Sequence, residues 1–178
     1  DSYGEYWRSY KFITDATSYD VVEKPEHFYQ SAVAFGNFQC MLADYPADTL
    51  NETIAGFHDT RARFAVFKKA VEEDILGRAA AVKEEIQFVL DREDVANCFS
   101  ELQDKGELPL RVTHNDTKLN NIMIDNKTGK AICVIDLDTV MPGLAMNDFG
   151  DSIRFGASTA AEDEKDLSKV SCSMGLFE

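Results

Sequence analysis

Side chains that can handle a hydroxyl group together with a metal ion gather in residues 112–125, VTHNDTKLNNIMID. Asp116 is a carboxylate that can accept a proton, and Lys118 is a cation in a chain whose formal net charge is −14. Asn121 carries an amide oxygen and Asp136 ends the next apolar run, and Mg²⁺ prefers such hard oxygen ligands. In the alternative interpretation, these Asn and Asp side chains only cap backbone groups in a solvated turn.

The spacing of these residues, counted from His114, is H-x-D-x-x-x-x-N, which is the spacing of the catalytic loop of protein kinases. A loop between two short strands can direct Asp116 at a substrate hydroxyl while Asn121 faces a metal ion. A hairpin that folds back can then bring Asp136 to the same ion. Phosphoryl transfer needs mainly positioning and charge neutralisation. In that chemistry Asp116 would accept the hydroxyl proton, Lys118 would offset developing charge, and His114 would brace the loop.

The elements expected around this segment form an α+β domain that is dominated by helices. Hydrophobic periodicity and turn residues predict a strand at 6–13, helices at 26–42, 58–74 and 77–102, a short strand at 108–116, a hairpin at 121–138, and a helix from 152 onward. We expect the third helix to break near 91–94 and Gly129 to supply the permissive turn of the hairpin. The last helix is expected to continue past the acidic run at 161–166, as a solvated face.

Apolar side chains at helical spacing predict the buried faces of two helices. They are Phe28, Val33 with Ala32, Phe35, Phe38 and Leu42 in the helix at 26–42, and Val82, Ile86, Val89 and Leu90 in the third helix. On the first strand, Tyr6, Trp7 and Tyr10 are interpreted as core packing, with an aromatic stacking platform as the alternative.

Composition excludes several classes of function. The 178 residues are 44% hydrophobic and 28% charged, as in ordinary globular proteins. The net charge of −14 argues against binding to nucleic acid or to an anionic membrane, and no apolar run has transmembrane length. The four cysteines lie far apart without metal-ligand spacing, so we expect buried free thiols in a reducing compartment, the cytoplasm. The oligomeric state is left open.

In these motifs the chain resembles the aminoglycoside phosphotransferase/choline kinase superfamily, the small-molecule relatives of protein kinases. The shared pattern is His114, Asp116 and Asn121, then Asp136 at a strand end, then Asp148 before a helix. Within this superfamily the chain is most similar to N-acetylhexosamine 1-kinases. The similar segments are THNDTKLNNIMID, VIDLDTVMPG and DFGDSIRFGA, and also SYD, AFGNFQ and PADTLNETI. The resemblance implies a protein-kinase-like C-terminal lobe that uses ATP and Mg²⁺ to phosphorylate the anomeric hydroxyl of an N-acetylhexosamine, giving a sugar 1-phosphate.

The resemblance also implies roles for individual residues. Asp116 matches the catalytic base, and Asn121 and Asp136 match the metal ligands. Asp148 matches the Asp that buttresses the catalytic loop, and Asp138 takes the place of an acidic residue often found two positions after the metal Asp. The DFG triplet that begins at Asp148 lies too far after the loop to be the metal-binding triplet of protein kinases.

The chain departs from the superfamily pattern in what it lacks. It contains no Gly-rich phosphate loop and no strand Lys with a helical Glu partner upstream. Residues 1–20 resemble the last strand of the nucleotide lobe with the hinge, where the backbone of Phe12 and Ile13 would meet adenine. Residues 21–178 resemble a truncated C-terminal lobe. We therefore expect the central part of a longer kinase, inactive when alone.

Other polar residues have simpler interpretations. His27 and His58 stand near predicted helix starts, where surface or capping roles are expected. Arg154 is a supporting candidate that either helps to hold phosphate or forms an ion pair with a nearby Asp.

Two rival functions stay open. One is a kinase of another small alcohol, such as choline, homoserine or an aminoglycoside. The other is a non-catalytic binding module on a degenerate kinase fold, against which the intact residues of the motif argue. Sulfatase-like and serine-hydrolase chemistry are excluded, because the sequence has no C/S-x-P-x-R and no G-x-S-x-G motif.

Overall fold

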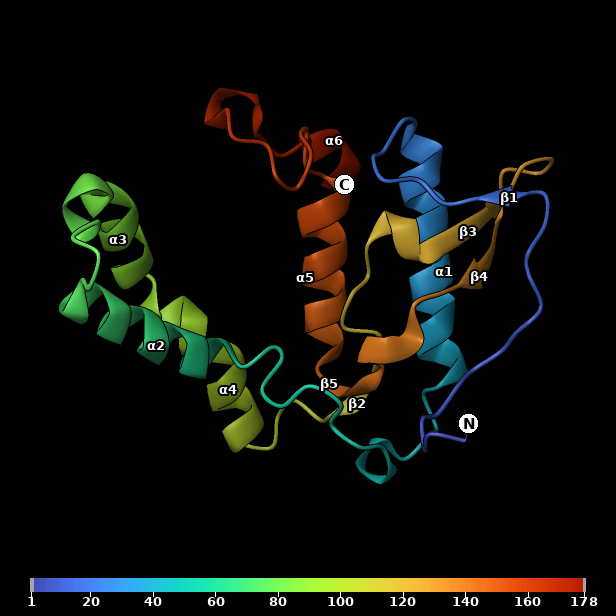
Figure 1. The fold of residues 1–178 in the computed structure, drawn as a ribbon, viewed down its shortest axis with the longest axis horizontal. Helices are drawn as coiled ribbons and strands as arrows, with labels where there is room; N and C mark the ends of the chain where they lie inside the picture. The colour runs from blue at the N-terminus through green and yellow to red at the C-terminus, as the bar shows by residue number, and fades with distance from the viewer. Residues whose placement is uncertain (1, 178) are drawn as a thin grey trace. The chain divides into compact units, whose positions relative to one another are not determined.

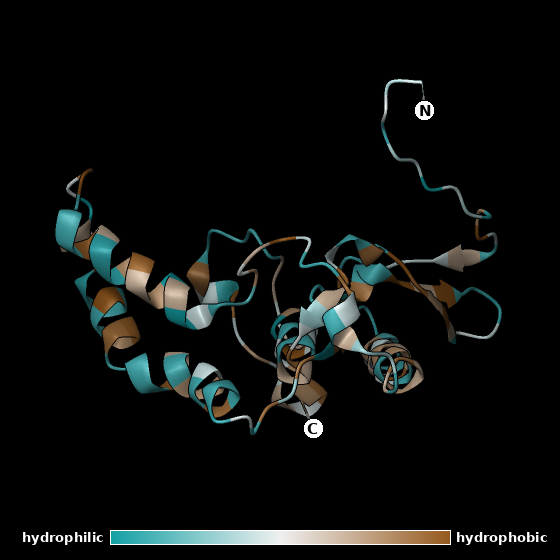
Figure 2. Ribbon diagram, turned by 90° about the horizontal axis from the view of Figure 1, so that it is seen from below, coloured by the Kyte–Doolittle hydropathy of each residue, from teal (hydrophilic) through white to brown (hydrophobic). Residues whose placement is uncertain are grey.

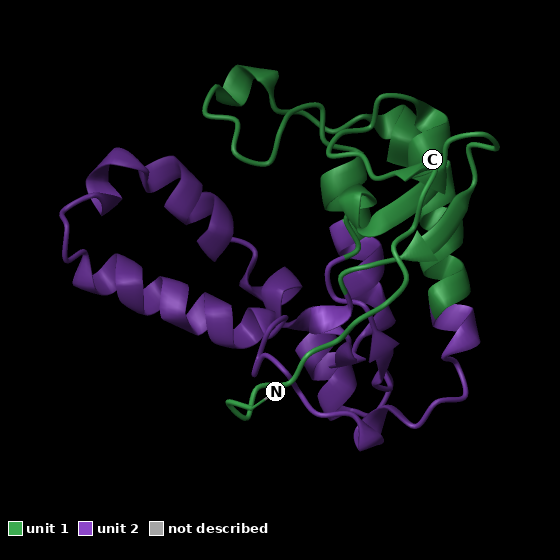
Figure 3. Cartoon of the chain, turned by 45° about the vertical axis from the view of Figure 1, so that its right-hand side comes forward, with its two compact units in different colours: residues 1–38, 117–136, 152–178 green, residues 39–116, 137–151 purple. Residues whose placement is uncertain are grey.

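The computed structural model describes residues 2–177. The chain forms two compact units, which Figure 3 shows in different colours. Unit 1 contains Asp1–Phe38, Thr117–Asp136 and Ser152–Glu178, and unit 2 contains Gln39–Asp116 and Leu137–Asp151. The helices α1 (Pro25–Met41) and α5 (Ala145–Gly156) contribute residues to both units.

Unit 1 is built on an antiparallel sheet whose strand order is β1–β3–β4. The strands are β1 (Ala16–Thr17), β3 (Ile122–Asp125) and β4 (Ala131–Val134). β3 and β4 form the predicted hairpin, with Ile122 opposite Val134. Phe35 of α1 packs against the buried side chains of Ile122 and Ile124, so the helix lies along the hairpin (Figure 1).

The hairpin turn is held by Asp125. Its Oδ1 accepts hydrogen bonds from the backbone N–H of Thr128 at 2.7 Å and from the Thr128 hydroxyl at 2.8 Å. These bonds lower the pKa of Asp125, and the bond from the Thr128 hydroxyl has the largest effect. Gly129 has a φ of 68°, a left-handed backbone that glycine adopts without steric cost. The predicted role of Gly129 in this turn is confirmed.

The predicted buried face of α1 is confirmed at three positions. Phe28, Phe35 and Phe38 are buried. The helix buries a stripe that also contains His27 and Ser31, so Val33 lies off that stripe and is exposed, against expectation. The expected surface or capping role of His27 is wrong, because its ring is buried and stacks on Tyr19 with a centroid distance of 4.0 Å.

The helix expected from residue 152 through the acidic run is wrong at both ends. α5 begins at Ala145 and ends at Gly156, where an added Cβ atom would overlap the Phe28 ring. The acidic run is irregular, and it is followed by the short helices η5 (Leu167–Lys169) and α6 (Met174–Phe177). Side chains compete with helical hydrogen bonding here: the Thr159 hydroxyl donates to Lys169 O at 2.9 Å, and Asp166 caps η5.

Unit 2 contains the two helices predicted at 58–74 and 77–102. The first is α2 (Thr60–Glu73), and the second is divided into η2 (Ala79–Ala81), α3 (Lys83–Leu90) and α4 (Glu93–Asp104). The short helix η1 (Ala47–Thr49) was not predicted. Asp59 caps α2 by accepting the N–H of Ala62 at 2.8 Å. The expected break in the third helix is confirmed between α3 and α4. Ile86, Val89 and Leu90 are half-buried, whereas Val82 precedes α3 and is exposed.

A two-stranded sheet completes unit 2. The predicted short strand is β2 (Arg111–Thr113), and it pairs with β5 (Met141–Gly143), with Val112 opposite Pro142. The sequence did not predict β5, because a three-residue strand that contains proline and glycine lacks strand signals. Two short helices contain or adjoin residues of the motif. η3 (Leu119–Asn121), in unit 1, ends with Asn121, and η4 (Leu137–Thr139), in unit 2, begins directly after Asp136.

The strand predicted at 6–13 is wrong. Residues 5–14 contain neither helix nor strand, and Tyr6, Trp7 and Tyr10 are exposed rather than packed in a core. The alternating pattern alone does not make a strand, since a strand needs a partner for its backbone groups.

None of the four cysteines forms a disulfide bond, but the expectation that they are buried is wrong. Cys98 and Cys133 are half-buried. Cys40, in the last turn of α1, and Cys172, in an isolated β-bridge with Ser158, are exposed. The helices mix apolar and polar residues along their length (Figure 2). Within the described residues, no helix combines the length and apolar character that crossing a membrane requires.

Candidate active site

The first half of the motif lies in unit 2, where Asp148 holds the backbone that follows β2. Asp148 is in the first turn of α5 and is 3% exposed. Its Oδ1 accepts the N–H of Asn115 at 2.7 Å, and its Oδ2 accepts the N–H of His114 at 3.0 Å. Gln39 donates to the same Oδ2 at 2.9 Å. The carboxylate is thus positioned as a support for this loop.

Asn115 is the most constrained residue of this loop. Its φ is 68°, in the left-handed region that Asn tolerates better than most residues. Its Oδ1 accepts the Thr113 hydroxyl at 2.9 Å, and its Nδ2 donates to Thr139 O at 2.9 Å. The Thr139 hydroxyl in turn donates to His114 O at 2.7 Å. Side chains from β2 and η4 therefore fix the turn from both sides.

Gly143 of β5 makes room for this network. A Cβ atom there would overlap the Thr113 hydroxyl and would lie 2.8 Å from Asn115 Oδ1. A side chain at position 143 would displace the two groups that hold the turn. Apart from the Pro-Gly pair itself, no local pattern signals this role of Gly143.

Asp116, the proposed base, follows Asn115 and is half-buried. Its backbone N–H donates to Nδ1 of the buried His114 at 3.3 Å, so the His114 ring braces the loop within one turn of chain. His58 Nε2 lies 2.9 Å from Asn115 O. The expected capping role of His58 is therefore wrong, since Asp59 caps α2 and His58 reaches the loop instead.

The proposed metal ligands lie in unit 1, on the hairpin. Asn121 immediately precedes β3 and is buried, and Asp136 follows β4 by two residues and is exposed. Asn121 O accepts the N–H of Ile135 at 2.9 Å. This bond joins the backbone of Asn121 to the residue that precedes Asp136, at the open end of the hairpin. Asp136 has a φ of 57°. One amide and one carboxylate are oxygen donors of the kind that Mg²⁺ takes from protein.

Lys118 and Arg154 share a partner in unit 1. Lys118 Nζ lies 3.5 Å from Glu162 Oε2, and Arg154 Nη1 lies 2.9 Å from Glu162 Oε1. Sequence reasoning missed Glu162, because a residue inside an acidic run carries no local signal for one specific ion pair. The remaining candidates are Phe12, Ile13 and Asp138. Phe12 is exposed and Ile13 is half-buried. Asp138 is exposed, and its backbone oxygen accepts the Thr53 hydroxyl at 3.2 Å.

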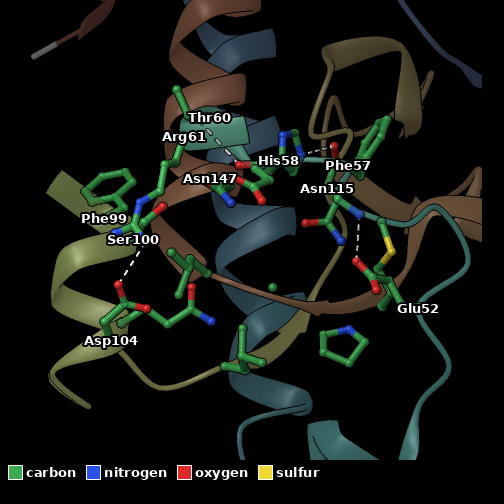
Figure 4. Close-up of a pocket in the computed structure, with 18 of the residues that line it drawn as sticks. Glu52, Phe57, His58, Thr60, Arg61, Phe99, Ser100, Asp104, Asn115 and Asn147 are labelled. Atoms are coloured by element: carbon green, nitrogen blue, oxygen red, sulfur yellow. Dashed lines mark hydrogen bonds and ion pairs between the residues drawn. The ribbon is translucent and has the colours of Figure 1, made fainter. Parts of the chain in front are cut away.

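A pocket of about 650 Å³ opens in unit 2 beside this loop (Figure 4). Its lining combines the aromatic rings of Phe57 and Phe99 with polar groups of His58, Asn115 and Asn147. The ion pair between Arg61 and Asp104, 2.9 Å long, lies at one side. Such a mixture of rings and hydrogen-bonding groups suits a small polar molecule.

Within unit 2 the structure brings together His114, Asp116 and Asp148. Within unit 1 it brings Asn121 close to Asp136. Unit 1 also brings Lys118 and Arg154 to a common partner, Glu162. A family model described as the phosphotransferase enzyme family matches residues 2–167, which include every residue of the motif.

Proposed function

Because the chain belongs to the phosphotransferase enzyme family, we propose that the protein transfers the terminal phosphoryl group of ATP to a hydroxyl group of a small molecule. The observation that carries this proposal is the hairpin pairing that holds Asn121 and Asp136 at one end of β3 and β4. A solvated turn would not need a buried amide and an exposed carboxylate at matched ends of a hairpin.

The roles that we propose follow the chemistry of each side chain. Asp116 accepts the proton of the acceptor hydroxyl as its oxygen bonds to the γ-phosphorus of ATP and the bond from that phosphorus to the β–γ bridging oxygen breaks, which releases ADP. Lys118 offsets charge on the transferred group. Asn121 and Asp136 would hold Mg²⁺, which supplies positive charge next to the ATP phosphates. The backbone of Phe12 and Ile13 would contact adenine, and Asp138 and Arg154 would support the site.

We propose an N-acetylhexosamine as the acceptor and its anomeric hydroxyl as the reacting group, which gives a sugar 1-phosphate. Support comes from the resemblance of the motifs and from the pocket beside Asn115, whose aromatic and amide groups suit a polyhydroxylated molecule. Choline, homoserine or an aminoglycoside are the alternative acceptors.

The test is turnover of ATP by the complete gene product that contains this chain, with a panel of hexosamines and the alternative acceptors. Asp116→Asn should lower kcat by roughly a hundredfold or more, because the general base is removed, and Asp136→Ala should do so because a metal ligand is lost. Asp163→Asn, at an exposed position outside the motif, is the matched control and should be neutral. Undiminished turnover in Asp116→Asn contradicts the proposal.

The rival interpretation as a non-catalytic module has its own test. Calorimetry should show that the complete protein binds ATP only when Mg²⁺ is present. In Asp136→Ala, added Mg²⁺ should no longer strengthen the binding of ATP, because a metal ligand is lost. Absence of ATP binding in the presence of Mg²⁺ would favour the non-catalytic module.

A further inference from the structure

We propose that His58 and His114 together clamp the peptide group between Asn115 and Asp116 and so set the direction of the Asp116 carboxylate. The two imidazoles act on opposite edges of one peptide group. His58 Nε2 lies 2.9 Å from the Asn115 oxygen, and His114 Nδ1 lies 3.3 Å from the Asp116 nitrogen. His58 is thereby a positioning residue for the proposed base, and its catalytic consequence rests on the proposed function.

Three other residues hold the groups that precede this peptide group. Asp148 holds the N–H of Asn115, and Thr113 and Thr139 hold its side chain. A rigid peptide group can rotate between two Cα atoms that stay in place, which reverses its C=O and N–H while changing ψ of Asn115 and φ of Asp116. Such a rotation displaces the Asp116 nitrogen and so tilts the tetrahedral Cα frame that carries the Asp116 side chain. By holding both edges of the peptide group, the two imidazoles therefore act on the direction of the carboxylate.

Each of the two bonds demands one tautomer. A carbonyl oxygen only accepts, so Nε2 of His58 must carry a proton. A backbone N–H only donates, so Nδ1 of His114 must be bare and its ring must carry its proton on Nε2. The two rings therefore differ in function: one donates to the peptide group and the other accepts from it.

His58 comes from a segment that is itself well fixed. Glu52 accepts the N–H of Gly56 at 2.8 Å, and the N–H of Asp59 donates to Gly56 O at 3.1 Å. The Phe57 ring lies 4.7 Å from the His58 ring, centroid to centroid, and limits its rotation. The turn that starts α2 is thus coupled to the loop of Asp116 through one side chain.

Two variants of the complete gene product separate the effect of the hydrogen-bond donor of His58 from the effect of its ring packing. His58→Phe keeps a ring of similar volume but has no donor, whereas His58→Gln replaces the ring but can place an N–H near the same position. We expect His58→Phe to lower kcat roughly ten- to a hundredfold with KM for ATP within about twofold, since misplacement of the base affects the chemical step. His58→Gln should recover most of the loss. Wild-type kcat in His58→Phe, or equal losses in both variants, overturns the inference.

A readout that is independent of turnover uses protein labelled with ¹⁵N at histidine and at the backbone. At pH 8.5, above the usual pKa of histidine, His58 should carry its proton on Nε2 and His114 should have a bare Nδ1. The amide resonance of Asp116 should shift in His58→Phe and return toward its wild-type position in His58→Gln. A proton on Nδ1 of His114, or an unshifted amide, overturns the clamp. If these spectra agree while the wild type turns over no acceptor, the proposed function fails and the clamp stands.

Discussion

The Asp148 carboxylate accepts the backbone N–H of Asn115 at 2.7 Å, across 33 positions of sequence. The same carboxylate accepts the N–H of His114, so one buried anion satisfies two backbone donors at the turn before Asp116. Buried donors without partners cost more free energy than most hydrogen bonds gain. The loop and the first turn of α5 are therefore one structural element.

Asp148→Asn should lower the free energy of unfolding by about 2–3 kcal/mol, because an amide offers one oxygen where the carboxylate offers two and turns an NH₂ group toward a backbone N–H. Urea unfolding followed by circular dichroism measures the change. Asp163→Asn, at an exposed position, should change it by less than about 0.5 kcal/mol. Equal effects of the two substitutions would contradict the support role of Asp148.

Gly143→Ala should destabilise the fold by about 1–3 kcal/mol, because its Cβ atom would overlap the Thr113 hydroxyl and crowd Asn115 Oδ1. Gly150→Ala is the matched control, since a Cβ atom at this position of α5 meets no atom within 4 Å. The control should be more stable than the wild type by roughly 0.5–1 kcal/mol through helix propensity. Thermal unfolding of both variants gives the comparison, and a neutral Gly143→Ala would show that the loop can move aside.

Thr128→Val should raise the pKa of Asp125 toward the ordinary value of 3.8, because the hydroxyl is the largest cause that lowers it. The rise should be partial, since the backbone N–H groups of Lys127 and Thr128 still donate. Carbon-13 titration of the Asp125 carboxyl group measures it. Ser168→Ala serves as the control, because it should raise the pKa of Asp166 and leave Asp125 unchanged.

The sign of the accompanying pH dependence follows from linkage. A carboxyl group whose pKa is lowered by folding stabilises the folded state at pH values above its ordinary pKa, and this contribution is lost as the pH falls through the lowered pKa. Wild type and Thr128→Val should therefore differ most in stability above about pH 5 and converge in stronger acid. A difference that grows with acidity would mean that Asp125 acts in another way.

Glu162→Gln should lower KM for ATP in the complete protein, roughly two- to tenfold at low salt, since it removes an anion that competes with phosphate near Lys118 and Arg154. Stability should change by less than about 1 kcal/mol, because the side chains are partly exposed and surface ion pairs contribute little. Glu164→Gln is the control, because Glu164 pairs with Lys169 and accepts the N–H of Asp166 instead of contacting Lys118 or Arg154. An increase of KM would instead show that Glu162 orients Lys118 for nucleotide binding.

Features that depend on local pattern were predictable from the sequence. The helices α1 and α2, the break before α4 and the β3–β4 hairpin follow from periodicity, caps and Gly129. The spacing from His114 to Asn121 also predicted a structured loop, and the bonds of His114 and Asn115 confirm that the loop is structured.

Features that depend on distant partners were not predictable. β5 forms only because β2 lies opposite, and α5 starts at Ala145 although no Ser, Thr, Asp or Asn immediately precedes it. His58 contacts Asn115, 57 residues away, and Glu162 contacts Lys118, 44 residues away. Local periodicity in the sequence does not predict contacts over such distances.

Trp7 is the single tryptophan of the sequence, and it lies 77% exposed in the segment that precedes Phe12 and Ile13. All indole emission of these 178 residues therefore originates from one solvent-facing ring. Unliganded protein should emit at long wavelength and be readily quenched by acrylamide, whereas any molecule that covers this stretch should shift the spectrum to the blue. The chain thus carries an intrinsic fluorophore beside the residues proposed to meet adenine, and nucleotide titrations need no added dye.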